Sequence, residues 1–191
     1  MKKTFIFCCF LFVLIISSAE AQKFRGSDKS AMDISYYPDN YAHDRKFAPE
    51  LIGNAKAMAR VTYSRPTKNG REVFGKLIPY GKVWRTGANE ATEIKFYQDA
   101  TIQGKKVKAG TYTLFTIPGA SEWTIILNSD MDHWGAYSYN EASDVLRVNV
   151  PAKKSDEVIE VFSIQFAKGI TNNTVMSLGW DNTVVDVPIS F

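Results

Sequence analysis

Short segments in which every second residue is hydrophobic run through most of this 191-residue chain. In the C-terminal segment, Val185, Val187 and Ile189 alternate with Asp186 and Pro188. A period of two places alternate side chains on opposite faces of a strand, so each such segment is expected to form a half-buried β-strand. Proline lacks the backbone donor that a central strand needs, so Pro188 indicates an edge strand. The same pattern recurs in segments 57–63, 92–96, 110–117, 123–127, 145–150, 157–167 and 176–180.

Turn residues separate these segments. Asn69-Gly70 is a turn dipeptide, and residues 99–107 have the pattern of a hairpin around Gly104-Lys105. Residues 71–78 are expected to form one or two helical turns, and no long amphipathic helix interrupts the series of strands. We therefore predict an all-β fold, a single-domain antiparallel β-sandwich with one short helix and a polar N-terminal segment. The strand order is open, and a jelly roll is one form of it.

The N-terminus has the pattern of a secretory signal peptide. Lys2 and Lys3 precede the apolar run Thr4–Ile16, and Ala19-Glu20-Ala21 supplies a cleavage motif. A bilayer span needs about 20 apolar residues, so an uncleaved membrane anchor is the less favoured alternative. We expect a signal peptide at 1–21 that is removed, an irregular segment at 22–56 that lies on the domain, and the β-sandwich at 57–191. The protein is then exported, periplasmic or secreted, and meets the membrane only through the cleaved peptide.

Composition excludes several classes of function. Both cysteines, Cys8 and Cys9, lie in the predicted signal peptide, so the remaining chain can form no disulfide and no cysteine-based catalytic or metal site. The formal net charge of +3 gives no electrostatic footprint for nucleic acid. We expect no nucleic-acid partner and no cofactor.

The loop 81–92 concentrates side chains that bind ligands. Trp84 can stack on a sugar ring, Arg85 offers a planar set of donors, and Asn89 and Glu90 can bracket hydroxyl groups. A structural reading stands beside this one. Arg85 and Glu90 can pair to hold the loop across the end of the sandwich, with Trp84 packed in the core.

Other candidates lie near this loop in sequence or in a second aromatic loop. Arg65 and Arg71 can join Arg85 in an anion-binding cluster, although three separate, individually paired arginines are the structural alternative. The segment 134–139 carries aromatic residues that can bind a ligand or cover one end of the core. The ligand-binding candidates outside the loop 81–92 are Arg65, Arg71, Tyr80, His133 and Trp134.

A metal site and a catalytic site are only weakly indicated. Asn128, Asp130 and Asp132 alternate like the start of a calcium loop, but His133 stands where the loop needs glycine, so no metal is predicted. Glu90 is the one catalytic candidate, as the acid or base of a glycoside hydrolase with a second carboxylate. Whether the protein is an enzyme stays open, and its residues favour a protein that is not an enzyme.

Five segments together resemble one known family. They are Tyr63–Pro66, Gly70–Gly75, Pro79–Thr92, Ala109–Pro118 and Glu122–Thr124. They are similar to the hallmark segments of a family of exported bacterial proteins, the domain of unknown function 2911 (DUF2911), over a region from about residue 30 to the C-terminus. The resemblance implies an exported, compact single domain. It implies no activity, substrate or catalytic residue.

The sequence favours a non-catalytic exported β-sandwich. It would bind a small, anionic or glycan-like ligand, or a protein partner, through the Trp84–Glu90 loop, because loops on a rigid scaffold commonly carry function. One alternative is an extracellular polysaccharide hydrolase that uses Glu90. The other is an envelope structural or interaction protein without a small ligand, which would present a broad apolar surface.

Overall fold

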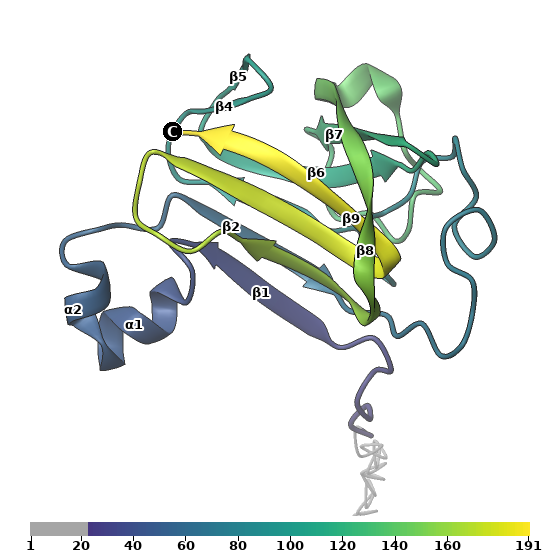
Figure 1. Cartoon of the computed structure of the whole chain (residues 1–191), viewed down its shortest axis with the longest axis horizontal. Coiled ribbons are helices and arrows are strands. Elements are labelled where there is room, and N and C mark those ends of the chain that lie inside the picture. Colours follow the sequence, from purple (N-terminus) through teal and green to yellow (C-terminus); the bar gives the residue numbers. More distant parts are fainter. Residues whose placement is uncertain (1–22) are drawn as a thin grey trace, which may run out of the picture.

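The computed structural model describes residues 23–191, and the predicted signal peptide lies outside the described residues. The described chain is mainly β-structure, arranged as nine antiparallel strands that pair in the order β1-β2-β3-β6-β7-β8-β9-β4-β5 (Figure 1). The all-β prediction is therefore confirmed. Within residues 23–191, no helix has both the length and the apolar character needed to cross a membrane.

The two longest strands, β8 and β9, come last in the chain. The strands are β1 (Met32–Tyr37), β2 (Ala59–Ser64), β3 (Glu93–Phe96), β4 (Ala100–Ile102), β5 (Lys105–Val107), β6 (Gly110–Ile117), β7 (Glu122–Asn128), β8 (Asp144–Phe166) and β9 (Asn173–Ser190). The helices are α1 (Tyr41–Phe47), α2 (Pro49–Ile52) and the 3₁₀ turn η1 (Glu141–Ser143). The predicted hairpin at 99–107 is present as β4 and β5, which pair from Ala100 with Val107 to Ile102 with Lys105.

The long strand β8 connects two layers. Its first part, residues 144–151, pairs with β7, and its second part, residues 152–166, pairs with β9. The register with β9 shifts twice, between Lys154 and Ile159 and between Ile159 and Ser163. Such bulges bend a strand, which allows one strand to belong to both layers. The segments 145–150 and 157–167, predicted as separate strands, are one strand, and segments 176–180 and 185–191 likewise merge in β9.

Alternating hydrophobic residues of both layers form one core. The inward residues of β3, β7 and β9 are almost completely buried, including Ile94, Trp123 and Val187. An aromatic group occupies the centre of this core. Its members are Phe74, Trp84, Trp123, Phe162 and Trp180.

Two regions differ from the sequence-based expectation. The segment 22–56, predicted to be irregular, contains β1, α1 and α2. The segment 71–78, predicted to be helical, forms turns in which the Gly75 amide donates to the Ile78 carbonyl over 2.8 Å. Tertiary contacts explain this second difference, because Phe74 is drawn into the aromatic core and the Val73 amide bonds Asp181.

Pro188 does not mark an edge strand, because β9 lies between β8 and β4. The pairing with β8 reaches Val185, and the pairing with β4 begins at Ile189. Pro188 therefore sits between two ladders, where its missing backbone donor disrupts neither of them.

Candidate functional site

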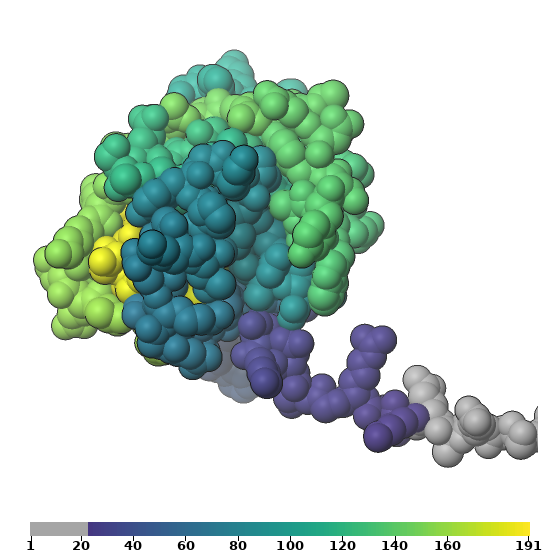
Figure 2. Space-filling view, turned by 90° about the vertical axis from the view of Figure 1, so that its right-hand side faces the viewer, coloured from purple at the N-terminus to yellow at the C-terminus, as the bar shows by residue number. Residues whose placement is uncertain are grey.

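The two loops singled out from the sequence meet at one end of the molecule. Glu90 and Trp134 form an isolated antiparallel bridge. The Ala91 amide donates to the His133 carbonyl, and the Gly135 amide donates to the Asn89 carbonyl, both over 2.9 Å. We call residues 85–91 and 133–137 the loop pair. Figure 2 shows this end, with the segment before β3 in blue-teal at the centre and the loop after β7 in green beside it.

Trp84 packs in the core and is only 5% exposed. Its ring stacks on Trp180 with centroids 6.0 Å apart, and its indole nitrogen donates to the Gly87 carbonyl over 3.1 Å. Its backbone also pairs with Thr116 of β6 in both directions. Of the two readings of Trp84 from the sequence, this geometry matches the structural one, since a ligand could reach the ring only by opening the core.

Arg85 lies beneath the loop between β7 and η1, residues 129–140, which we call the second loop. A β-carbon added to Gly135 would lie 3.5 Å from the Arg85 Nη1 atom, and Gly135 has a φ of +71° that glycine tolerates best. Within residues 23–191, Arg85 Nε is buried and has no hydrogen-bond partner. The Arg85–Glu90 ion pair of the structural reading does not occur among the ion pairs of the described residues.

The outer side of the loop pair is aromatic and open. Trp134 is 62% exposed and Tyr137 is 85% exposed, and the Tyr137 ring lies against Gly135. Glu90 is exposed and Asn89 is half-buried, with a left-handed φ of 56°. Hydrogen bonds from the Ser30 amide and then from the Asn89 side chain lower the pKa of Asp28, so the chain before β1 reaches the same end.

His133 faces the sheet and not the solvent. Its ring packs edge-on against Phe115 with centroids 5.5 Å apart. In the described part of the chain, its Nε2 atom is buried without a hydrogen-bond partner, and Asp130 Oδ2 lies 3.5 Å away as the nearest ion-pairing group. The His133 side chain therefore helps to seat the loop over β6.

The predicted arginine cluster does not form. Arg65 contacts Asp33 Oδ2 at 2.9 Å, Ser163 Oγ at 2.9 Å and the Phe162 carbonyl at 3.2 Å, so it links β1 to β8. Arg71 donates to the carbonyls of the preceding turn, at residues 67 and 68. Arg65 and Arg71 thus have separate structural partners, which was the alternative reading.

Tyr80 has a local contact. It is partly exposed, and its ring lies over Gly75, where a β-carbon would approach Tyr80 Cε2 to 2.9 Å. Its contact lies within the turn that precedes the loop 81–92.

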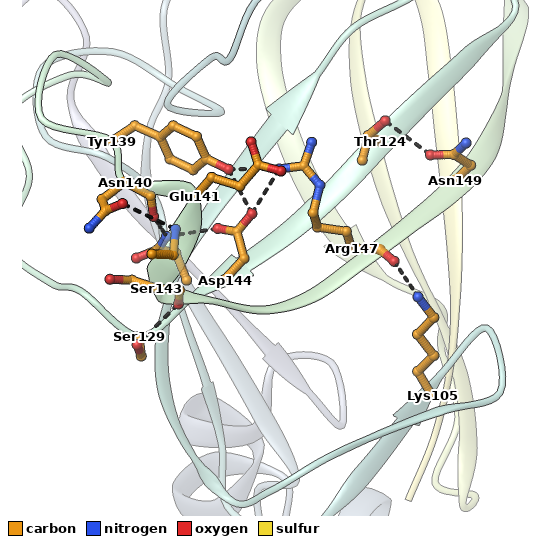
Figure 3. Close-up of polar contacts among 12 residues, drawn as sticks. Lys105, Thr124, Ser129, Tyr139, Asn140, Glu141, Ser143, Asp144, Arg147 and Asn149 are labelled. Carbon is orange, nitrogen blue, oxygen red and sulfur yellow. Dashed lines mark hydrogen bonds and ion pairs between the residues drawn. The ribbon is translucent and has the colours of Figure 1, made fainter.

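A buried carboxylate holds the second loop in place (Figure 3). The Asp144 side chain is 5% exposed and accepts hydrogen bonds from Tyr139 at 2.6 Å, from Arg147 at 2.8 Å and from Asn128 at 2.8 Å. Burial, followed by the hydrogen bond to Asp144, raises the pKa of Tyr139 to about 12. The hydrogen bond to Asp144 likewise raises the pKa of Arg147.

The weak metal candidates do not converge. Asn128 uses its amide nitrogen on Asp144 and the Asn140 carbonyl, and its oxygen accepts from the Asp130 amide. Among residues 23–191, no group of three or more histidine, cysteine, aspartate or glutamate side chains is arranged to hold a metal ion.

Glu93 is an acidic residue with a shifted pKa that the sequence did not single out. Burial, and then the nearby Asp132 carboxylate, raise the pKa of Glu93 on β3, while Arg60 opposes the shift. Nothing local marks Glu93, because its neighbour Asp132 is brought in by the second loop.

Comparison with known proteins identifies a family. A search of the curated proteins found no match, and a search of the solved structures found none either. The family model described as protein of unknown function (DUF2911) matches residues 50–189. The match covers most of the chain and agrees with the resemblance of the sequence segments. The chain belongs to the DUF2911 family of proteins of unknown function.

Proposed function

We propose that this protein is exported and acts as a non-catalytic binding module, and that the loop pair recognises a saccharide. The N-terminal sequence pattern supports export. The observation that carries the binding proposal is the pair of highly exposed aromatic residues, Trp134 and Tyr137, beside the exposed Glu90, whose backbone bridges that of Trp134.

The chemistry of the loop pair suits a sugar. Indole and phenol rings offer flat apolar faces for stacking against a pyranose ring. Asn89 and Glu90 supply donors and acceptors for hydroxyl groups next to those faces. A large exposed aromatic group is costly to leave in water, and it commonly marks an interaction surface.

The position of Glu90 favours binding over hydrolysis. Glycoside hydrolases set their general acid in an enclosed, largely apolar site opposite a second carboxylate. Glu90 is exposed at the open end of the loop pair. A binding surface therefore fits this residue better than a catalytic cleft does.

Tryptophan fluorescence provides a direct test. The chain has four tryptophans, and Trp84, Trp123 and Trp180 are buried, so Trp134 is the one that acrylamide can reach readily. We expect a bound oligosaccharide to protect Trp134 from quenching during titration with a panel of neutral oligosaccharides. The Trp134→Phe protein should lose most of the fluorescence that acrylamide quenches, which would show that this fluorescence comes from Trp134.

A matched pair of variants separates binding from folding. Trp134→Ala should abolish the calorimetric binding signal of the neutral oligosaccharide that protects Trp134, whereas Phe47→Ala, the truncation of another highly exposed aromatic residue on α1, should leave it intact. Both variants should melt close to the parent protein. Binding that survives Trp134→Ala, or no protection by any oligosaccharide of the panel, would refute the proposal.

A further inference from the structure

A hollow lies away from the loop pair, between α1, the chain before β2 and the end of β3. Its volume is about 690 Å³, within the range of small-ligand sites. We call it the tyrosine groove, after the three tyrosines that line it. It is lined by Tyr36, Tyr41, Arg45, Lys56 and Tyr97, together with Ala42, Ala57 and Gln98.

The groove is rich in aromatic surface. The rings of Tyr36 and Tyr41 are 6.1 Å apart between centroids, so they form a continuous wall. Tyr97, just after β3, also lines the groove and is 41% exposed. Aromatic walls of this kind offer stacking faces to a ring-shaped ligand.

The charge of the groove is positive. The lining carries Arg45 and Lys56 and no carboxylate. Lys95 places its ammonium 4.8 Å from the centroid of the Tyr97 ring, and Arg45 lies 6.0 Å from that of Tyr41. Arg45 thus lines the hollow beside Tyr41, and Lys95 lies next to the hollow through its contact with Tyr97.

The adjoining sheet surface adds two more cations in an unfavourable arrangement. Arg60 of β2 lies directly opposite Lys95 of β3, and Tyr36 of β1 lies directly opposite Arg60. Like charges at directly opposed positions destabilise an antiparallel pair. A sequence that keeps such a pair breaks a local rule, and such departures concentrate at functional sites.

Neighbouring acids do not neutralise these cations. Within residues 23–191, none of Arg45, Lys56, Arg60 and Lys95 takes part in an ion pair. Arg60 Nε is also buried and has no hydrogen-bond partner there. Glu93 lies on the same face one row away, opposite Thr62, and its carboxylate offsets only part of this charge.

We propose that the tyrosine groove and the adjoining row of Arg60 and Lys95 form a second binding site, and that it takes an acidic saccharide whose rings lie in the groove and whose carboxylate or sulfate groups meet these two cations. The sugar rings stack on the tyrosines, and the anionic groups receive charge-assisted hydrogen bonds, which are stronger than neutral ones. Binding also relieves the repulsion between the two opposed cations. The site is independent of the loop pair, since they share no residue.

The features of the groove favour a saccharide over a nucleic acid. A nucleic-acid site needs an extended basic stripe, usually on a strongly basic domain. Here the formal net charge is only +3, and the hollow is of small-ligand size. A short acidic sugar therefore matches both the charge and the dimensions.

The test is calorimetric titration of the purified protein with three tetrasaccharides of equal length. The probes are tetragalacturonate, a sulfated galactan tetrasaccharide and uncharged cellotetraose. We expect at least one of the two acidic probes to bind, and a comparison of their affinities shows whether the site prefers carboxylate or sulfate. Cellotetraose should bind at least about tenfold more weakly, because it lacks the anionic group that makes a charge-assisted hydrogen bond. Added salt should weaken the acidic interaction by screening.

Charge-removal variants complete the test. Arg60→Gln combined with Lys95→Gln should weaken the acidic probe by about tenfold or more, while its melting temperature without ligand stays equal or rises because the repulsion is gone. A control with Lys76→Gln and Lys154→Gln, two exposed lysines elsewhere, changes the net charge equally and should bind normally. Trp134→Ala should also bind the acidic probe normally, which separates this site from the loop pair.

Three results would overturn the proposal. The first is that neither acidic probe binds. The second is equal binding of the acidic probes by the Arg60→Gln/Lys95→Gln protein and by the parent. The third is that a single-stranded oligonucleotide binds the groove more tightly than both acidic saccharides.

Discussion

Replacing Trp84 by alanine distinguishes a core tryptophan from a ligand-binding one. In the structure Trp84 is 5% exposed, stacks on Trp180 and makes edge contacts with Phe74, Trp123 and Phe162. The truncation removes these contacts and leaves a cavity at the centre of the core. It also removes the donor that satisfies the buried Gly87 carbonyl.

The expected loss of stability is large. Truncation of a buried tryptophan to alanine costs about 3–5 kcal/mol, and a buried acceptor left without its donor adds about 1–3 kcal/mol. The sum, roughly 4–8 kcal/mol, is a major part of the about 5–15 kcal/mol by which a typical domain is stable. For a chain of this length each kcal/mol lowers the melting temperature by about 2–4 °C, so the decrease should be at least roughly 8 °C.

The assay is thermal unfolding of the Trp84→Ala and Trp134→Ala proteins beside the parent, followed by far-ultraviolet circular dichroism. The two variants carry the same substitution, but Trp134 is 62% exposed, so its change should cost no more than about 0.5 kcal/mol. Similar, small shifts for both variants would refute the reasoning, because a core tryptophan and a surface tryptophan cannot cost the same.

Three further predictions concern charged side chains. Asp144→Asn should lower the free energy of unfolding by about 3–5 kcal/mol, because the charge that pairs with Arg147 is lost and an amide oxygen that accepts from Tyr139 and Arg147 leaves its NH2 group facing the Asn128 donor; an unchanged urea midpoint would contradict this. Burial and Asp132 raise the pKa of Glu93 in the folded protein. The favourable contribution of Glu93 to the free energy of unfolding is therefore complete below pH 4.5, the ordinary pKa of the group, and is lost as pH rises through its raised pKa in the folded state. Glu93→Gln should thus stabilise the protein at pH 7 but not below pH 4.5, and a gain independent of pH would exclude this cause. Arg65→Gln should speed amide hydrogen exchange in β1 while leaving β3 protected, and equal protection in β1 would show that Arg65 does not hold that strand to β8.

The strands were predictable because their signal is local. Alternation at 92–96, 110–117 and 123–127 identified β3, β6 and β7 and the face of each that is buried. The same signal was interrupted by polar residues between 150 and 157, where β8 continues through solvent-exposed bulges. Local hydrophobicity therefore placed the strands, but it could not show that two of them are continuous.

The candidate site was predictable only in part. The sequence singled out both loops, but it could not distinguish a core Trp84 from an exposed Trp134, since both lie in polar, irregular stretches. The difference arises because Trp84 pairs with Thr116 of β6, which turns its side chain inward, whereas Trp134 pairs with the exposed Glu90.

The sequence by itself determined the all-β class, the family and the buried face of strands such as β3, β6 and β7, because these depend on composition and on neighbours one or two positions apart. The tertiary structure decided which distant residues meet. The loop pair joins residues 85–91 to 133–137, and the sheet sets Arg60 opposite Lys95. Strand order and register fix these contacts, and both depend on the packing of the whole core, so no single segment encodes them.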